Sequence, residues 1–245
     1  MRNSRPSLLA AFREWWRDRR ARAGTFPALC SLAVELWEFL RDSTPERERQ
    51  RYGDVDYDWE RRVNTTSAAV GWRNRLLGVF HSPYQPTEPA LFREMLDGLA
   101  LSSGVWSQFT FLDLGSGKGR TLLLASEYPF RRVLGVELLP ELHHLAQENI
   151  RAFKSDSQKC AALEALCGDA RDFPFPAEPL LIYLFNPFPE SVLAQVVRNL
   201  EQSLREHPRP VIVLYHNPLL ANVLDASFLL ERTASTHQYA IYSNR

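Results

Sequence analysis

The feature that most constrains the fold of this chain is a regular alternation of short apolar runs and helical segments from residue 109 onward. Five runs have the length and composition of buried strands: Phe109–Leu114, Arg132–Glu137, Leu163–Cys167, Leu180–Phe185 and Val211–Tyr215. Segments with helical spacing lie between them, at Leu122–Tyr128, Leu138–Phe153 and Val192–Leu204. Strands that are apolar along their length and alternate with helices are typical of a parallel sheet covered on both faces.

Two further apolar runs, Phe228–Glu231 and Tyr239–Tyr242, follow with only a few residues between them. So short a link permits a hairpin but not the crossover of a parallel pair, so the last strand should be antiparallel. A helix should precede the first strand, from Thr87 as N-cap to Leu99. We therefore predict an α/β domain with a doubly wound, mostly parallel, seven-stranded sheet.

The start of the chain differs in composition from the rest. Residues 1–75 contain five of the six Trp and most of the Arg. We therefore predict a helical, Arg/Trp-rich N-terminal extension over residues 1–80 and a Rossmann-like domain over 81–245. The Arg-rich first helix suits either a membrane surface or acidic partner, or a solvated face with its aromatics packed on the domain. We favour the solvated face.

Bulk properties exclude several classes of protein. The formal net charge is +0, so charge gives no reason to expect nucleic acid or an anionic membrane as a partner. The apolar stretch Phe26–Leu40 is too short, and too charged at Glu35 and Glu38, to span a bilayer. It also begins too late for a signal peptide, so we expect a cytoplasmic protein.

A glycine-rich turn, LDLGSGKGRTLLL, follows the first predicted strand at Leu112–Leu124. A phosphate-binding P-loop requires Gly at position 112, where this chain has Leu. A dinucleotide turn requires its third glycine at 120, but here it falls at Gly119. The spacing therefore excludes the P-loop and weakens the dinucleotide interpretation.

Two acidic residues near this turn indicate a different nucleoside cofactor. Glu137 ends the second strand, 22 residues after Gly115, where a carboxylate can accept both ribose hydroxyls. Asp113 lies just before the turn, where it would repel a diphosphate but suit a cofactor with a positive amino group. S-adenosylmethionine combines this amino group with a ribose and an adenine.

Four motifs carry a family resemblance. "FLDLGSGKGR", "GVEL", "GDA" and "NPF" occur in the order and spacing of the class I S-adenosylmethionine-dependent methyltransferases, and the similarity covers about residues 84–245. The glycine motif resembles those of the non-SET histone lysine methyltransferases and of small bacterial relatives. Tyr57–Thr65 is similar to a segment that precedes the domain in these bacterial relatives.

The resemblance implies roles for individual residues. Asp113 would face the methionine amino group, and Glu137 would hold the ribose. Asp169 would reach the adenine amino group, with Ala170 beside it. The remaining implied cofactor contacts are the turn residues Gly115, Ser116, Gly117 and Gly119, and Tyr84 and Thr87 in the loop ahead of the domain. No metal is implied.

The fourth strand ends in Asn186-Pro187-Phe188-Pro189. Amino-directed methyltransferases commonly carry Asn/Asp-Pro-Pro-Tyr/Phe here, so Phe replaces the second Pro. The resemblance implies that Asn186 accepts a hydrogen bond from the target nitrogen, while Phe188 offers an aromatic face to a cation. His216 is a candidate base by position alone, although a surface or structural role is favoured.

These residues predict methyl transfer to a nitrogen of a protein lysine or a small-molecule amine, with S-adenosylhomocysteine as product. Two alternatives stay open: an NAD-type oxidoreductase, and a non-catalytic cofactor-binding module.

Overall fold

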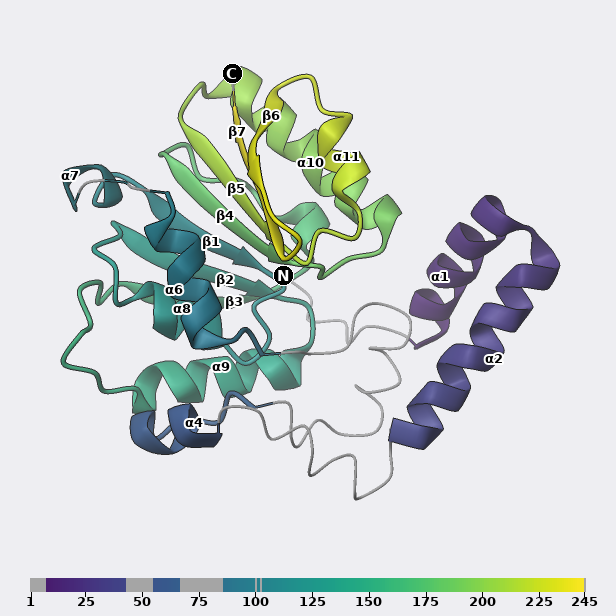
Figure 1. Ribbon diagram of the computed structural model, residues 1–245, viewed down its shortest axis with the longest axis horizontal. Helices are drawn as coiled ribbons and strands as arrows, with labels where there is room; N and C mark the ends of the chain where they lie inside the picture. The colour runs from purple at the N-terminus through teal and green to yellow at the C-terminus, as the bar shows by residue number, and fades with distance from the viewer. Residues whose placement is uncertain (1–7, 43–54, 67–85, 100, 102, 245) are drawn as a thin grey trace.

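The computed structural model describes residues 8–42, 55–66, 86–99, 101 and 103–244 (Figure 1). A seven-stranded sheet forms its centre, with the strand order β3-β2-β1-β4-β5-β7-β6. The strands are β1 (Thr110–Leu114), β2 (Arg132–Glu137), β3 (Leu163–Cys167), β4 (Leu180–Phe185), β5 (Val211–His216), β6 (Leu230–Ser235) and β7 (Tyr239–Asn244).

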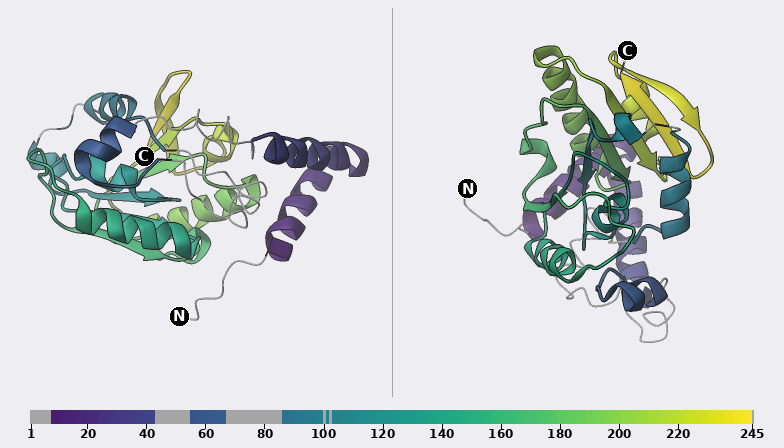
Figure 2. Two further views of the ribbon diagram at one scale, coloured as in Figure 1. Left: turned by 90° about the horizontal axis from the view of Figure 1, so that it is seen from below. Right: turned by 90° about the vertical axis from the view of Figure 1, so that its left-hand side faces the viewer.

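Helices cover both faces of the sheet (Figures 1 and 2). One face packs against α6, α8 and α9, and the other packs against η1, α10 and α11. These elements are α6 (Pro89–Asp97), α8 (Arg120–Ala125), α9 (Pro140–Ala152), η1 (Ala170–Asp172), α10 (Glu190–Glu206) and α11 (Ala221–Asp225). A short helix, α7 (Ser103–Trp106), precedes β1.

The predicted fold class is confirmed. Strands β1 to β5 are parallel to one another, whereas β7 is antiparallel to both β5 and β6. The predicted bounds differ most at β6, which begins at Leu230 rather than Phe228 and extends to Ser235. Because β6 is an edge strand whose residues after Leu230 are exposed, it lacks the apolar run that marks the central strands.

The predicted N-cap of the helix before β1 was wrong by one residue. Glu88 caps α6, because its Oε2 accepts a hydrogen bond from the Leu91 amide at 2.8 Å. The Thr87 side chain is instead buried, and its hydroxyl lies 2.9 Å from the Tyr183 hydroxyl. The helix also ends at Asp97, before the predicted Leu99.

The N-terminal extension contains α1 (Leu8–Ala23), α2 (Thr25–Asp42) and α4 (Val55–Arg61). Helices α1 and α2 lie beside each other at one end of the molecule (Figure 1). Polar contacts tie α1 to the domain: Ser191 donates to Asp18 at 2.5 Å, and Arg22 pairs with Glu190 at 2.8 Å. Among the described residues, no helix has the length and apolarity required to span a membrane.

Replacing Leu112 by Ala tests the central packing. Leu112 is fully buried in β1, so we expect Leu112→Ala to lower the free energy of unfolding by ~2–5 kcal/mol in urea denaturation. Leu219→Ala is the matched control, because that side chain is 67% exposed and its loss should change stability by less than ~0.5 kcal/mol. Equal losses at the two positions would contradict the assigned core.

Candidate active site

The candidate site lies where the central parallel strands end, the edge at which open α/β sheets bind ligands. The strand register sets which side chains meet there. Asp113 on β1 is paired with Gly135 on β2 and with Tyr183 on β4. Because side chains alternate between faces, Asp113, Glu137 and Tyr183 project from the face that α6, α8 and α9 cover.

Asp113 is almost completely buried, with 2% of its surface exposed. Burial, together with the smaller effect of the nearby Glu137 charge, raises the pKa of its carboxyl group to about 7. The Thr121 hydroxyl on α8 donates a hydrogen bond to Asp113 Oδ2, which acts in the opposite direction. Asp113 is thus a partly protonated carboxyl group near neutral pH, poised to ionise if a cation binds beside it.

Glu137 ties the end of β2 to the glycine turn. Its Oε2 accepts a hydrogen bond from the Gly117 amide at 2.8 Å, and its Oε1 accepts one from the Leu139 amide at 2.8 Å. Burial raises its pKa, whereas these backbone donors act against that shift. Each carboxylate oxygen can accept a second hydrogen bond, so a diol could still be held here.

The glycine turn adopts a backbone that other residues rarely take. Gly115, Gly117 and Gly119 have φ values of 92°, 54° and 83°. A Cβ atom on Gly115 would lie only 2.6 Å from Cβ of Pro187. The turn therefore packs directly on the loop after β4, and this contact requires glycine. Ser116 Oγ is buried there without a hydrogen-bond partner in the described part of the chain.

Asn186, the predicted target-binding residue, also has a left-handed backbone, with φ of 44°. Its Oδ1 accepts a hydrogen bond from the Tyr215 hydroxyl at 3.3 Å. Non-glycine residues in this region cost free energy and often mark functional sites. The nearby Phe188 ring is partly buried against the core cluster on the α10 side of the sheet.

A buried chain of hydrogen bonds links Thr87, Tyr183 and His216. The Tyr183 hydroxyl lies 2.9 Å from Thr87 Oγ1 and 2.8 Å from His216 Nδ1. These two contacts satisfy the buried hydroxyls of Thr87 and Tyr183.

This arrangement does not favour His216 as a base. Its Nδ1 is already in hydrogen-bond contact with the Tyr183 hydroxyl, and burial lowers its pKa to about 4. The ring also stacks on Phe185, with centroids 3.8 Å apart. His216 is therefore a neutral, buried ring with a weakly basic imidazole.

Asp169 and Ala170 lie after β3, as the sequence places them. The Asp169 carboxylate accepts a hydrogen bond from the Arg171 amide at 2.9 Å and pairs with Arg171 Nη2 at 2.7 Å. Arg171 also donates to Glu14 of α1 at 3.1 Å. The predicted adenine contact is thus already paired with an arginine that reaches the N-terminal extension.

Two predicted contacts from the loop ahead of the domain have different outcomes. Tyr84 lies outside the described residues, so its role stays a prediction. Thr87 is described, and the structure brings it to Tyr183. Sequence reasoning missed Thr121, Tyr183 and Arg171. Tyr183 could have been found from the strand pattern. Tyr183 and Phe185 lie two residues apart on β4 and so share one face, and Tyr183 is paired with Asp113 on β1.

Gly115→Ala tests the geometry of the turn. The new methyl group would clash with Pro187 and force an alanine into left-handed backbone, which costs ~1–2 kcal/mol by itself. We expect a loss of at least this size in the free energy of unfolding. Gly104→Ala is the control, because a Cβ there meets no atom within 4 Å. A Gly115→Ala protein as stable as this control would contradict the described turn.

Comparisons with known proteins agree with the fold. Residues 111–207 match the family model described as a methyltransferase domain. The release factor glutamine methyltransferase of Vibrio cholerae is 47% identical over 57 residues, which are 23% of this chain and 20% of the relative. The chain thus matches only about a fifth of that relative's length.

Two solved structures resemble the chain weakly. An RNA methyltransferase from Salinibacter ruber, in complex with S-adenosyl-L-homocysteine, has a TM-score of 0.42 and 20% identity, over 64% of this chain and 91% of its own. A ribosomal protein L11 methylase from Lactobacillus delbrueckii subsp. bulgaricus has a TM-score of 0.43 and 14% identity, over 63% and 76%. The matched residues 111–207 run from β1 to the end of α10, so the part of the chain that is similar to a methyltransferase domain contains the glycine turn, Asp113 and Glu137.

Proposed function

We propose that this chain transfers the methyl group of S-adenosylmethionine to a nitrogen atom of a protein lysine or a small-molecule amine. The observation that carries the proposal is the pair of buried carboxyl groups, Asp113 and Glu137, on either side of a left-handed glycine turn. Asp113 suits a positive amino group, and Glu137 suits a ribose diol. A diphosphate would meet the carboxyl group of Asp113 beside the turn, which argues against an oxidoreductase of the NAD type.

The residues present fit this cofactor. Asp113 would ionise and pair with its amino group, while Glu137 would accept the ribose hydroxyls. The glycine turn lets backbone approach closely because Gly115 and Gly117 carry no side chains. Asp169 would have to share its carboxylate between Arg171 and the adenine amino group.

When bound, the cofactor supplies a methyl group activated on a sulfonium sulfur. Asn186 would then hold the acceptor, because its amide oxygen can accept an N–H while Tyr215 fixes the orientation of the amide. Phe188 would contact the carbon chain or cationic form of the amine. Holding the nitrogen in line with the methyl group can contribute up to ~7–11 kcal/mol, so positioning would be the main contribution of the protein.

The division of the chain also stays a proposal. We retain an N-terminal extension over residues 1–80 and a catalytic domain over 81–245. The ion pair between Glu14 and Arg171 supports a role for α1 near the adenine end of the site. A protein or small-molecule acceptor would enter over the same edge of the sheet.

The raised pKa of Asp113 predicts proton-linked binding. With a pKa of about 7, Asp113 is mostly protonated at pH 6 and ionises when a positive amino group binds. Affinity for S-adenosylmethionine should therefore rise between pH 6 and 7.5, with release of a proton. Calorimetry in two buffers of different ionisation enthalpy measures this release. Asp113→Asn should abolish it; an equal release from wild type and variant would contradict the assignment.

Asn186→Ala separates catalysis from cofactor binding. We expect S-adenosylhomocysteine affinity to stay within about twofold, because Asn186 has no proposed cofactor contact. Transfer of labelled methyl into protein and small-molecule cell extracts should fall ~10²-fold or more, as when one preorganised polar group is removed from other active sites. Asn222→Ala, at an exposed position on α11, is the matched control.

The stability of the label tests the target atom. Label on nitrogen survives mild alkali, whereas a methyl ester is hydrolysed. Label released by alkali would contradict nitrogen as the acceptor. The wild-type protein could instead bind the cofactor but transfer no methyl group to either extract. That result would favour a non-catalytic binding module.

A further inference from the structure

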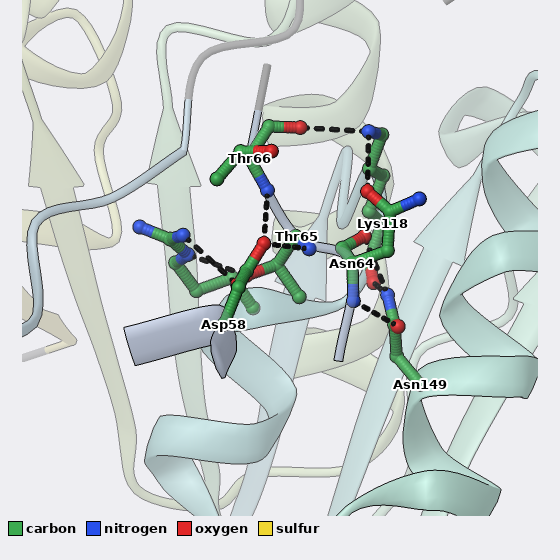
Figure 3. A network of polar contacts seen from close by, with 7 residues as sticks. Asp58, Asn64, Thr65, Thr66, Lys118 and Asn149 are labelled. Carbon is green, nitrogen blue, oxygen red and sulfur yellow. Dashed lines mark hydrogen bonds and ion pairs between the residues drawn. The ribbon is translucent and has the colours of Figure 1, made fainter. Parts of the chain in front are cut away.

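The segment Tyr57–Thr66, here called the anchor segment, packs against the glycine turn although it lies far outside the matched residues 111–207 (Figure 3). It starts within α4 and ends in extended chain. Lys118 and Arg120, which flank the last glycine of the turn, bind it together with Asn149 on α9. Arg61 of the segment also donates to Ser155 at 2.5 Å and lies 3.8 Å from Glu127. Lys118 and Arg120 connect the segment to the turn proposed to hold the cofactor.

Arg120 is held by Asp58. Arg120 is only 2% exposed, and its Nη2 lies 3.2 Å from Asp58 Oδ1 while its Nε donates to Thr65 Oγ1 at 2.7 Å. Asp58 also accepts hydrogen bonds from the Thr65 and Thr66 amides, at 2.6 Å and 2.8 Å. The guanidinium group in addition lies over the Tyr57 ring, 5.2 Å from its centroid. The first residue of α8 is thus fixed from outside the matched domain.

Lys118 lies within the turn and points to the same segment. The side chain is fully buried, and its Nζ donates to the Thr66 carbonyl at 2.7 Å and to Asn64 Oδ1 at 3.2 Å (Figure 3). Asn149 Nδ2 donates to the Lys118 carbonyl and to the Asn64 carbonyl, both at 2.9 Å. Lys118 is therefore held at two places, through its side-chain amine and through its backbone carbonyl oxygen.

The charged side chains of this arrangement depend on one another. Lys118 and Arg120 are two buried cations near one buried carboxylate, Asp58. Burial lowers the pKa of Lys118 to about 8; Asp58 acts against this shift, and the charge of Arg120 adds to it. Removing Asp58 would leave two buried cations without a negative partner, which is costly. The glycines at 117 and 119 are the most flexible residue type, so these flanking contacts restrict the turn together with the hydrogen bond from Gly117 to Glu137.

We infer that the anchor segment is part of the cofactor site: Asp58 and Asn64 act through Lys118 and Arg120, as positioning residues, to hold the glycine turn in its binding shape. The inference rests on the proposed function, because it assumes that the turn binds S-adenosylmethionine. None of these four side chains needs to touch the cofactor. A turn released from them would sample other backbone conformations and would bind more weakly without losing any direct contact.

Calorimetric titration of the full-length protein with S-adenosylhomocysteine tests this inference. Lys118→Met keeps the length of the side chain but removes its donor, and Asp58→Asn keeps the shape of Asp58 but removes its charge. We expect each to raise the dissociation constant at least tenfold, under conditions where circular dichroism shows a folded protein. Lys154→Met and Asp156→Asn, at exposed positions, are matched controls that should bind like the wild type.

Two milder variants keep the inference testable if those proteins do not fold. Lys118→Arg retains a cationic donor and should recover most of the affinity that Lys118→Met loses. Asn64→Ala keeps both cations and Asp58, removes only one acceptor of Lys118, and should weaken binding at least threefold.

The outcomes separate this inference from the proposed function. Wild-type protein that fails to bind S-adenosylhomocysteine would contradict the proposed function. Wild-type binding, with folded Lys118, Asp58 and Asn64 variants that bind within twofold of it, would overturn the inference alone. Lower melting temperatures with unchanged dissociation constants would also overturn it, because they would show that the anchor segment only stabilises the fold.

Discussion

The left-handed glycine turn between β1 and α8 is the constraint on which the rest of the site depends. Three glycines with positive φ let the chain reverse direction at the carboxyl end of the sheet. The turn then brings the Gly117 amide to Glu137 and packs Gly115 on Pro187. The turn thereby contacts the ends of both β2 and β4, and its glycines present backbone rather than side chains to the site.

The charged side chains around the turn are arranged so that the acidic ones face the site. Asp113 and Glu137 are both buried, and burial disfavours their charged forms. Lys118 and Arg120 lie in the same turn but point away toward Asp58 and Thr66, so they do not serve as phosphate ligands. The acidic side chains therefore remain available to a ligand. Such side chains disfavour a diphosphate, whereas a cofactor with a positive amino group would stabilise their charged form.

Much of this could be predicted from the sequence, because its signals are local. Apolar runs identified the central strands, the short last connection predicted the antiparallel β7, and the glycine spacing predicted the turn. Edge strand β6 was placed too early, because only its first residue is buried. Thr87 was predicted as an N-cap from local preference. Its hydroxyl instead forms a hydrogen bond with Tyr183, which lies nearly a hundred residues further along the chain.

Most of the contacts that sequence reasoning missed are long-range. The glycine motif predicts no partner for Lys118, and nothing in its neighbourhood along the chain points to Thr66. Arg120 meets Asp58 across more than sixty residues, and Arg171 meets Glu14 across more than one hundred and fifty. Such pairs depend on how the extension packs on the domain, and a single sequence carries no local pattern for that.

Binding of S-adenosylmethionine, measured by calorimetry on the wild type and on Glu137→Gln, tests the central claim most directly. Glu137→Gln keeps the shape of the side chain but leaves one acceptor oxygen for two backbone amides and the ribose. The account predicts wild-type binding with a dissociation constant of ~1–100 μM, typical of enzyme ligands, and at least tenfold weaker binding by the variant. Glu164→Gln, at an exposed position on β3, should bind like the wild type. A folded wild-type protein without affinity for S-adenosylmethionine, or equal binding by Glu137→Gln, would contradict the account.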